Sequence, residues 1–313
     1  MIAPFITAPN LIAALLTLVP YLGAAFFPSA TIAVARKLPL WARLTCPCLL
    51  SIPYVLVTDA ASDFRWRWFA LYALLPVAIA MLLWHAARAD TSNRGNWRDF
   101  FVLAVLGLAV DLRWFEAAWP AHLAIFNKIL LLDAGIYAFL AIRELDGVGF
   151  DLRLRLPDLG IGLREVAFYA PIALAIGLAL GFLHGHGVWP GAGAMVFAWV
   201  FTFFFIAVPE ELFFRGWLQN LLERRMGRYP ALFLTAALFG LAHFNKRAVH
   251  FNWRYVLMAA IAGVFYGRAW RSRRRVGASA SDTSITTRAS TTVTISGCTA
   301  HRSHKDQMAS TVA

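Results

Sequence analysis

Charged residues and cysteines are both scarce in this sequence. Asp, Glu, Lys and Arg make up only 15% of the 313 residues, against about 25% in soluble globular proteins. Hydrophobic residues make up 60%, which is more apolar surface than a water-soluble protein of this length can bury. The three cysteines provide neither a disulfide framework nor a zinc-binding pattern, so we interpret them as small apolar residues. The composition excludes intrinsic disorder and ordinary soluble folds, and it predicts a polytopic membrane protein.

Long apolar runs divide the chain into candidate membrane segments. A helix that crosses the hydrocarbon core needs about 20 mostly apolar residues. Because lipid offers no hydrogen-bond partners to the backbone, we expect these segments to be helices. The predicted fold class is all-α, a polytopic membrane bundle with about eight membrane segments. The runs that support it, of which the second and fourth are short enough to be re-entrant or interfacial, are Leu11–Phe27, Leu44–Val57, Trp68–Trp84, Phe100–Val110, Leu123–Ile142, Val166–Leu183, Ala192–Val208, Ala231–Phe244 and Trp253–Trp270.

Polar stretches mark three regions. A charged stretch at 143–157 separates an N-terminal membrane-spanning region, residues 1–145, from a second membrane region, residues 146–275. Residues 276–313 are rich in Ser and Thr and contain no apolar run long enough to cross a bilayer. Such a segment buries too little surface to offset the entropy of ordering it, so we expect it to be disordered.

Basic residues are absent from the first 35 positions, although the chain carries 29 Lys and Arg against 17 Asp and Glu. Five arginines gather at 268–275, directly after an apolar run. This placement is typical of a cytoplasmic flank that meets anionic lipid rather than of a nucleic-acid site. The first apolar run has no basic region before it, so we expect it to remain as a span. We therefore expect an integral protein of a bacterial inner membrane, with this cluster cytoplasmic, the N-terminus outside and no nucleic-acid partner.

Two carboxylates follow a charge-free apolar run. In the stretch FTFFFIAVPEELFFR, Glu210 and Glu211 come directly after the run Ala192–Val208. Ionisable groups at membrane depth cost about 2.5–3.5 kcal/mol each, so they usually have a partner or a function. Glu211 and Arg215 are four residues apart and can pair on one helix face, whereas Glu210 projects about 100° away. Pro209 removes a backbone donor, so we expect a kink beside the carboxylates. Alone, the same pattern would also fit a helix that simply leaves the membrane.

A histidine near the end of the next apolar run favours a functional interpretation. His243 follows Phe239 by one helical turn on the same face. A single His on an apolar helix is more often a packed core residue than a catalyst. A carboxylate and an imidazole at the ends of consecutive spans can nevertheless hold one water between them, which is an arrangement for general-base hydrolysis. Glu210 and His243 are therefore the candidate catalytic pair.

Glu210-Glu211-x-x-x-Arg215 and Phe239-x-x-x-His243 resemble the first two motifs of the CPBP family. That family comprises intramembrane glutamic endopeptidases, including the type II CAAX prenyl proteases and bacterial Abi-type relatives. Aromatic and glycine residues beside the two motifs add to the likeness, which covers the second membrane region. The N-terminal region resembles the extra spans of some bacterial members only loosely.

The resemblance implies a metal-independent peptidase without a cofactor, acting on a membrane-embedded or membrane-associated peptide. It implies that Glu210 is the general base that activates water and that His243 holds and polarises this water. Glu211, Arg215 and Phe239 would structure the site. A zinc site is the alternative, with the two Glu, His243 and His250 as ligands, but the chain has no HExxH motif.

The sequence departs from the family after the arginine cluster. Members normally end with another membrane helix that carries a His-x-x-x-Asn or His-x-x-x-Asp motif and supplies oxyanion donors. Here Asp282 and Thr283 stand about where that His is expected, and the polar tail follows. We interpret this as an altered C-terminus, such as a reading-frame shift would produce, that impairs activity. The pairs His184/His186 and His301/His304 are poor substitutes, since they lie in a Gly-rich stretch and in the tail.

Two other classes of function compete with a peptidase. The first is a non-catalytic CPBP-like protein, a membrane scaffold or an immunity-type binding protein, which the missing third motif favours. The second is a transporter, in which Lys128, Asp133 and the two Glu would line a path. The spacing of Lys128 and Asp133 favours a structural ion pair instead, and we find no internal repeat of the kind that transporters contain.

Overall fold

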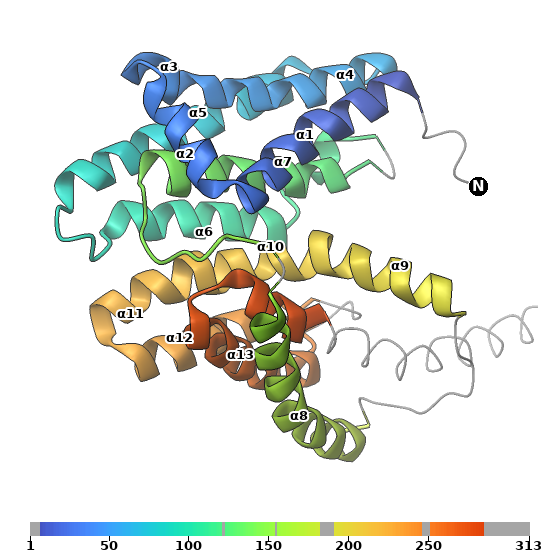
Figure 1. Cartoon of the computed structure of the whole chain (residues 1–313). Helices are drawn as coiled ribbons and strands as arrows, with labels where there is room; N and C mark the ends of the chain where they lie inside the picture. The colour runs from blue at the N-terminus through green and yellow to red at the C-terminus, as the bar shows by residue number, and fades with distance from the viewer. Residues whose placement is uncertain (1–6, 121–122, 154, 182–190, 246–250, 285–313) are drawn as a thin grey trace, which may run out of the picture. The chain divides into compact units, whose positions relative to one another are not determined.

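The computed structural model describes residues 7–120, 123–153, 155–181, 191–245 and 251–284. Throughout these residues the regular structure is helical and no strand occurs (Figure 1). The predicted all-α fold class is confirmed. The chain divides into two compact units, which we describe separately. Unit 1 comprises Met1–Arg153 with Asn220–Arg225, and unit 2 comprises Leu154–Gln219 with Met226–Ala313.

Unit 1 is a bundle of helices of unequal length around an aromatic core. Tyr54 stacks on Tyr72 with ring centroids 5.3 Å apart, and the indole N–H of Trp119 donates a 2.7 Å hydrogen bond to the Tyr72 hydroxyl. That hydroxyl in turn donates to the side-chain oxygen of Asn127 at 2.9 Å, so these three side chains form a chain of buried hydrogen bonds. The elements are α1 Ala8–Phe26, α2 Pro28–Lys37, α3 Leu40–Thr45, η2 Cys46–Ser51, α4 Ile52–Ala60, α5 Trp66–Ala89, α6 Trp97–Asp111, η3 Glu116–Ala118, α7 Ile125–Ile136 and η4 Tyr137–Ile142.

Unit 2 carries the two motifs. Its elements are α8 Leu156–Ala179, α9 Ala192–Thr202, η5 Phe203–Ala207, α10 Val208–Glu211, η6 Leu212–Gln219, α12 Arg228–Leu241 and α13 Trp253–Arg273. Residues 276–284 form a further helical segment and are buried. We expected the whole of 276–313 to be disordered, and for these first residues the structure differs. The remainder of that tail lies outside the described residues.

A single 35-residue helix, Ala192–Met226, contains both glutamates, and we call it the Glu-bearing helix. It is not uniformly α-helical, because π-helical turns lie on both sides of the short element α10, which begins at Val208. Pro209 lies inside this continuous helix, directly after the first of these π-helical stretches, and it removes one backbone donor there. π-helical turns within long helices are frequent at functional sites. The last turns, Asn220–Met226, are element α11.

Glycines allow α12 and α13 to approach each other closely in unit 2. A Cβ added to Gly263 would lie 3.0 Å from the Cα of Ala236, and one added to Gly240 would lie 2.6 Å from the carbonyl oxygen of Val256. Small residues at a helix–helix contact are typical of membrane proteins, in which dispersion contacts and hydrogen bonds hold helices together. This close contact places α13 against the helix that carries His243.

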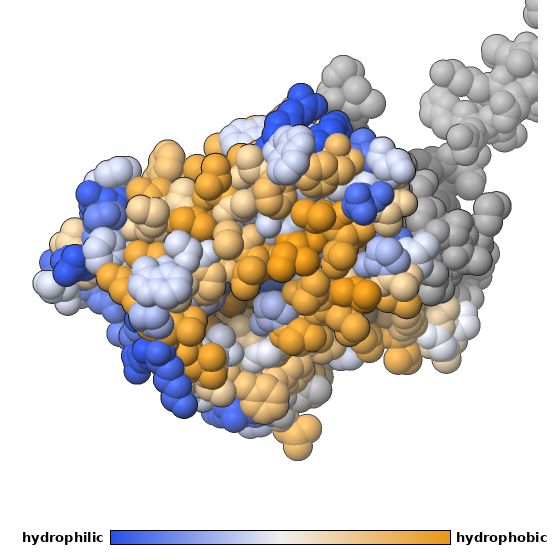
Figure 2. Space-filling model, turned by 90° about the horizontal axis from the view of Figure 1, so that it is seen from above, coloured by the Kyte–Doolittle hydropathy of each residue, from blue (hydrophilic) through white to orange (hydrophobic). Residues whose placement is uncertain are grey.

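Among the residues that the structure describes, six helices are long and apolar enough to cross a membrane. They correspond to six of the nine predicted runs. Of the other three, α6 has 15 residues, α12 has 14, and α13 has 21 but does not meet the same criterion of apolarity. Large apolar side chains are exposed on helices such as α1, α5 and α9, and Figure 2 shows hydrophobic residues across the middle of one face. An exposed apolar surface of this kind suits contact with lipid rather than water.

Candidate active site

Glu211 and Arg215 form a buried ion pair on the Glu-bearing helix. Neither side chain has any exposed surface, and Arg215 Nη1 lies 3.1 Å from Glu211 Oε1. The predicted pairing of these two residues is thus present. Removing two charges from water is costly, and only a well-arranged partner compensates for it. The pair is therefore expected to constrain the local structure strongly.

Aromatic rings surround the guanidinium group of Arg215. Its Cζ lies 4.4 Å from the ring centroid of Phe239, 5.4 Å from that of Tyr266 and 5.8 Å from that of Phe214. Arg215 Nη2 also donates a 3.1 Å hydrogen bond to the carbonyl of Gly263 on α13. A cation over several ring faces in a desolvated site gains about 2 kcal/mol or more. Phe239 is therefore a direct neighbour of the ion pair.

His243 lies just beyond the end of α12 and is half-buried. Its ring is stacked on Tyr255, with centroids 5.4 Å apart and planes 14° from parallel, and it lies 4.8 Å from the ring of Phe239. His243 Nδ1 is 2.8 Å from the carbonyl oxygen of Phe239. A carbonyl can only accept, so Nδ1 carries the proton, and Nε2 of the neutral ring is the acceptor. One face of the ring and one nitrogen are thus fixed.

Glu210 occupies the turn of α10 that also holds Glu211, and it is half-buried. Among the predicted site residues, Arg215 contacts both Glu211 and Phe239. His243 contacts the ring and the backbone carbonyl of Phe239. The pairing of Glu210 with His243 across one water stays a prediction.

One contact to this cluster was not predicted from the sequence. Thr283, in the buried segment 276–284, donates a 2.9 Å hydrogen bond from its hydroxyl to Glu211 Oε1. Its Ser/Thr-rich surroundings suggested a solvated tail, so its composition pointed away from the site. The only signal was its position, about where the CPBP family places the His of a third motif.

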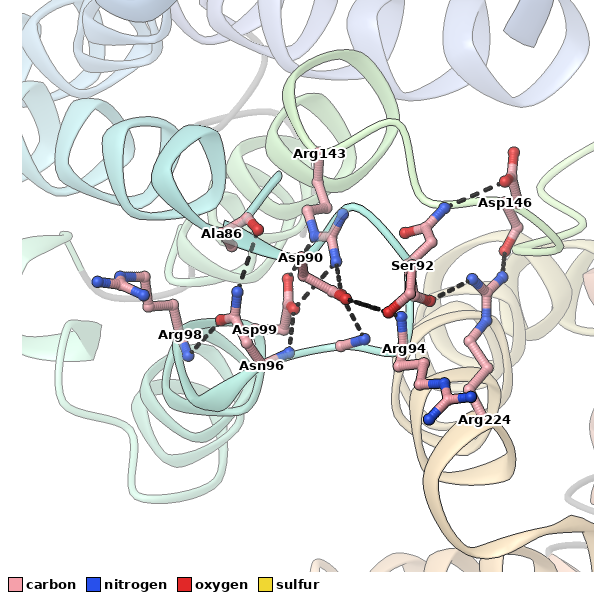
Figure 3. Close-up of polar contacts among 12 residues, drawn as sticks. Ala86, Asp90, Ser92, Arg94, Asn96, Arg98, Asp99, Arg143, Asp146 and Arg224 are labelled. Carbon is pink, nitrogen blue, oxygen red and sulfur yellow. Dashed lines mark hydrogen bonds and ion pairs between the residues drawn. The ribbon is translucent and has the colours of Figure 1, made fainter. Parts of the chain in front are cut away.

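Unit 1 holds a second buried polar cluster, which surrounds Arg143 (Figure 3). Arg143 Nη2 lies 2.6 Å from Asp90 Oδ2, and Nε lies 2.9 Å from Asp99 Oδ1. Asp99 also completes a capping box with Asn96 at the start of α6. Burial alone would raise the pKa of Asp90, but hydrogen bonds from the backbone N–H groups of Gly95 and Arg94, the Ser92 hydroxyl and the charge of Arg143 together lower it.

The last turns of the Glu-bearing helix, Asn220–Arg225, belong to unit 1 and contact the same loop within that unit. Arg224 Nη1 donates a 2.7 Å hydrogen bond to the carbonyl of Asn93, and Arg225 Nε donates to the carbonyl of Gly95 at 3.1 Å. Gly95 has a φ of 83°, and a Cβ there would lie 2.8 Å from Leu221, so only glycine fits. These two arginines therefore bind protein backbone within unit 1.

The predicted ion pair between Lys128 and Asp133 is wrong. Asp133 is buried in α7 and neither of its carboxylate oxygens has a hydrogen-bond partner among the described residues, whereas Lys128 is exposed. The two positions are five apart, which turns their side chains to different faces of the helix.

No three His, Cys, Asp or Glu side chains in the described part of the chain are grouped so that they could hold a metal ion. His250, the remaining ligand of the alternative zinc site, lies outside the described residues, as do His184, His186, His301 and His304.

Comparison with known proteins places the two motifs in a family. Residues 192–281 match the family model of the type II CAAX prenyl endopeptidase Rce1-like proteins. The match covers the Glu-bearing helix, α12, α13 and most of the helical segment that carries Thr283, and so it includes every candidate site residue. No curated protein and no solved structure shows a significant match to the chain. Over residues 192–281 the chain is therefore similar to the Rce1-like type II CAAX prenyl endopeptidases.

Proposed function

We propose that the chain is an intramembrane glutamic endopeptidase that hydrolyses a peptide bond in a membrane-embedded or membrane-associated substrate without a metal ion. The observation that carries the proposal is the buried Glu211–Arg215 pair, which lies one residue from Glu210 and contacts the aromatic residue that holds His243. A half-buried carboxylate and a half-buried imidazole thus flank a rigid core within a domain of a peptidase family.

In the proposed mechanism Glu210 is the general base. Neutral His243 already uses its Nδ1 proton on the Phe239 carbonyl, so its Nε2 accepts a hydrogen bond from the attacking water. The Glu210 carboxylate accepts the second hydrogen bond and removes that proton as the water oxygen attacks the peptide carbonyl. With both protons of the water engaged, a lone pair of its oxygen faces the substrate. As the tetrahedral intermediate collapses, the C–N bond breaks and Glu210 returns the proton to the departing amine nitrogen. Glu211, Arg215 and Phe239 act by holding this geometry.

A non-catalytic role for the same fold is the second candidate, and one observation favours it. The described segment 276–284 has no His, although a third motif with oxyanion donors is expected there. In that case the domain would bind a membrane protein without cleaving it, as a scaffold or an immunity-type protein.

The test is cleavage of membrane peptides by the purified chain in detergent or liposomes. Glu210→Gln removes the base but keeps the size of the side chain, and we expect cleavage to fall about 10²- to 10⁴-fold with an unchanged melting temperature. A strong zinc chelator should leave the rate unchanged. Glu223→Gln, on the same helix but outside the site, is the matched control. Cleavage that survives Glu210→Gln, or that the chelator abolishes, would contradict the proposal, and a fully inactive wild-type chain would favour the binding role.

A further inference from the structure

The hydroxyl groups of the buried segment 276–284 differ in what they contact. Ser281 donates to the carbonyl of Gly277 at 2.8 Å, and Ser284 donates to that of Ser281 at 3.0 Å. These bonds return to the segment's own backbone, as is common for Ser and Thr in helices. The hydroxyl of Thr283 instead reaches a side chain of another element, Glu211 Oε1, while it also lies 3.1 Å from the carbonyl of Ser279. The Ser279 hydroxyl, which lies 3.2 Å from the carbonyl of Val276, is a further hydrogen-bond partner of Glu211.

The segment is held firmly against α8, so this hydroxyl is fixed in place. A Cβ added to Gly162 of α8 would lie 3.0 Å from the Cβ of Ser281 and 3.2 Å from the carbonyl oxygen of Ala278. At the start of the segment, Arg275 Nε lies 2.9 Å from Asp158 Oδ2 of α8. Close packing and an ion pair thus act on the same short stretch. Thr283 itself is only 1% exposed.

Glu211 needs hydrogen-bond donors besides Arg215 in this position, and Thr283 and Ser279 supply them. Arg215 approaches Oε1 only, and the rings around Arg215 leave the guanidinium little freedom. A buried carboxylate with too few donors costs several kcal/mol, and a hydrogen bond from a hydroxyl to a charged group is worth about 1.5–3 kcal/mol. The Thr283 hydroxyl also fixes the rotation of the carboxylate, since it and the guanidinium approach the same oxygen from two elements.

We infer that Thr283 is a positioning residue of the proposed peptidase: its hydroxyl holds Glu211 in the orientation that keeps Arg215 paired and presents Glu210 to the water. This inference rests on the proposed function. It also assigns the first part of the Ser/Thr-rich stretch to the working domain, because a residue that binds Glu211 is part of the site and not of a detached tail.

The test compares Thr283→Val, which keeps the shape but removes the hydroxyl, with Thr283→Ser, which keeps the hydroxyl. We expect Thr283→Val to lower kcat about 10- to 100-fold, the loss of one hydrogen bond to a charged group, with KM unchanged. Thr283→Ser should restore kcat to within a few-fold of the wild-type value. Ser284→Ala, whose hydroxyl bonds only within its own segment, is the matched control. Equal kcat for the Val and wild-type chains, or no rescue by Ser, would overturn the inference.

A second measurement separates this inference from the proposed function. Melting temperatures are compared for three variants: Thr283→Val, Glu211→Asp and the double variant. Glu211→Asp keeps the negative charge but shortens the side chain by one methylene group. If Thr283 holds Glu211, the effects are not additive and the double variant is little worse than Glu211→Asp. Strictly additive effects would overturn the inference. Melting temperatures can be measured without any cleavage. If the chain shows no Glu210-dependent activity, the proposed peptidase function is refuted, but the melting temperatures still test whether Thr283 holds Glu211.

Discussion

Arg215 lies with its guanidinium 3.1 Å from the Glu211 carboxylate and 4.4 Å from the ring of Phe239, and neither member of the ion pair is exposed. Removing one member leaves the other charge buried without compensation. Arg215→Ala is therefore expected to destabilise unit 2 by about 3–5 kcal/mol, seen as a lower melting temperature in detergent. Arg228→Ala, at an exposed arginine, should change stability by less than about 1 kcal/mol. The double variant Glu211→Leu/Arg215→Met should be more stable than Arg215→Ala, and a double variant that is less stable would contradict this account.

His243 is expected to share a site with Glu210. An experimental structure should place the Glu210 carboxylate and the His243 ring within reach of one bridging water, and a separation above about 8 Å would refute the shared site. His243→Phe keeps an aromatic ring against Tyr255 but removes Nε2. We expect it to fold normally and to lose most of the cleavage activity that depends on Glu210.

The chain as it stands is expected to be a slow peptidase. Loss of one oxyanion donor commonly lowers the rate about 10²- to 10³-fold, and the expected third motif would supply two. The hydroxyls of Ser281 and Ser284 bond to their own backbone, and that of Thr283 bonds to Glu211, so they are poorly placed to replace those donors. A version with a family-type final helix carrying His-x-x-x-Asn should cleave faster in the same assay. Equal, Glu210-dependent rates for both versions would show that the third motif is not needed.

Arg143 is expected to be the most sensitive charged position of unit 1. Its side chain is 3% exposed and pairs with Asp90 and Asp99, so Arg143→Ala should lower stability by about 3–5 kcal/mol. Arg153→Ala is the matched control, because Arg153 is mostly exposed and pairs with Asp151 at the surface. We expect less than about 1 kcal/mol for that change, and similar effects of the two variants would contradict the prediction.

Stability should also fall in acid. The pKa of Asp90 is lowered in the folded state by the surrounding hydrogen bonds and charge, and that of Glu144 is lowered chiefly by the hydrogen bond from Arg36. A carboxylate whose pKa is lowered by folding stabilises the protein above its unfolded pKa, about 4. That contribution is lost as the pH falls through the folded pKa. The melting temperature should therefore be level above about pH 5 and fall below it, and Asp90→Asn should flatten part of this fall.

The topology prediction concerns the two groups of arginines around α12 and α13. Reporter fusions after Arg228 and after Arg275 should both report the cytoplasm, since basic flanks stay inside. The prediction holds whether α12 and α13 both cross the bilayer or both re-enter it, because two passages return the chain to the same side. Reporters on opposite sides would refute it.

The fold class, the membrane setting and the Glu211–Arg215 pair could all be predicted from the residues and their spacing. In lipid, the backbone N–H and C=O groups of an apolar run of about 20 residues find hydrogen-bond partners only if the run is a helix. A spacing of four residues places two side chains on the same face of that helix, whatever surrounds them. The motif positions 210, 211, 215, 239 and 243 were also sufficient to indicate the family, which the match over 192–281 confirms.

The surroundings of those residues depend on how the helices pack, and they could not be predicted. Composition predicted disorder after residue 275, but residues 276–284 are helical and buried. Close packing against α8 and the ion pair between Arg275 and Asp158 stabilise this segment, whose own side chains are small and polar. The same limit applies to Lys128 and Asp133, where sequence spacing suggested a pair that the structure does not contain. Contacts between elements far apart in the chain, such as Thr283 with Glu211 or Arg143 with Asp90, depend on which helices become neighbours, and no local pattern encodes that.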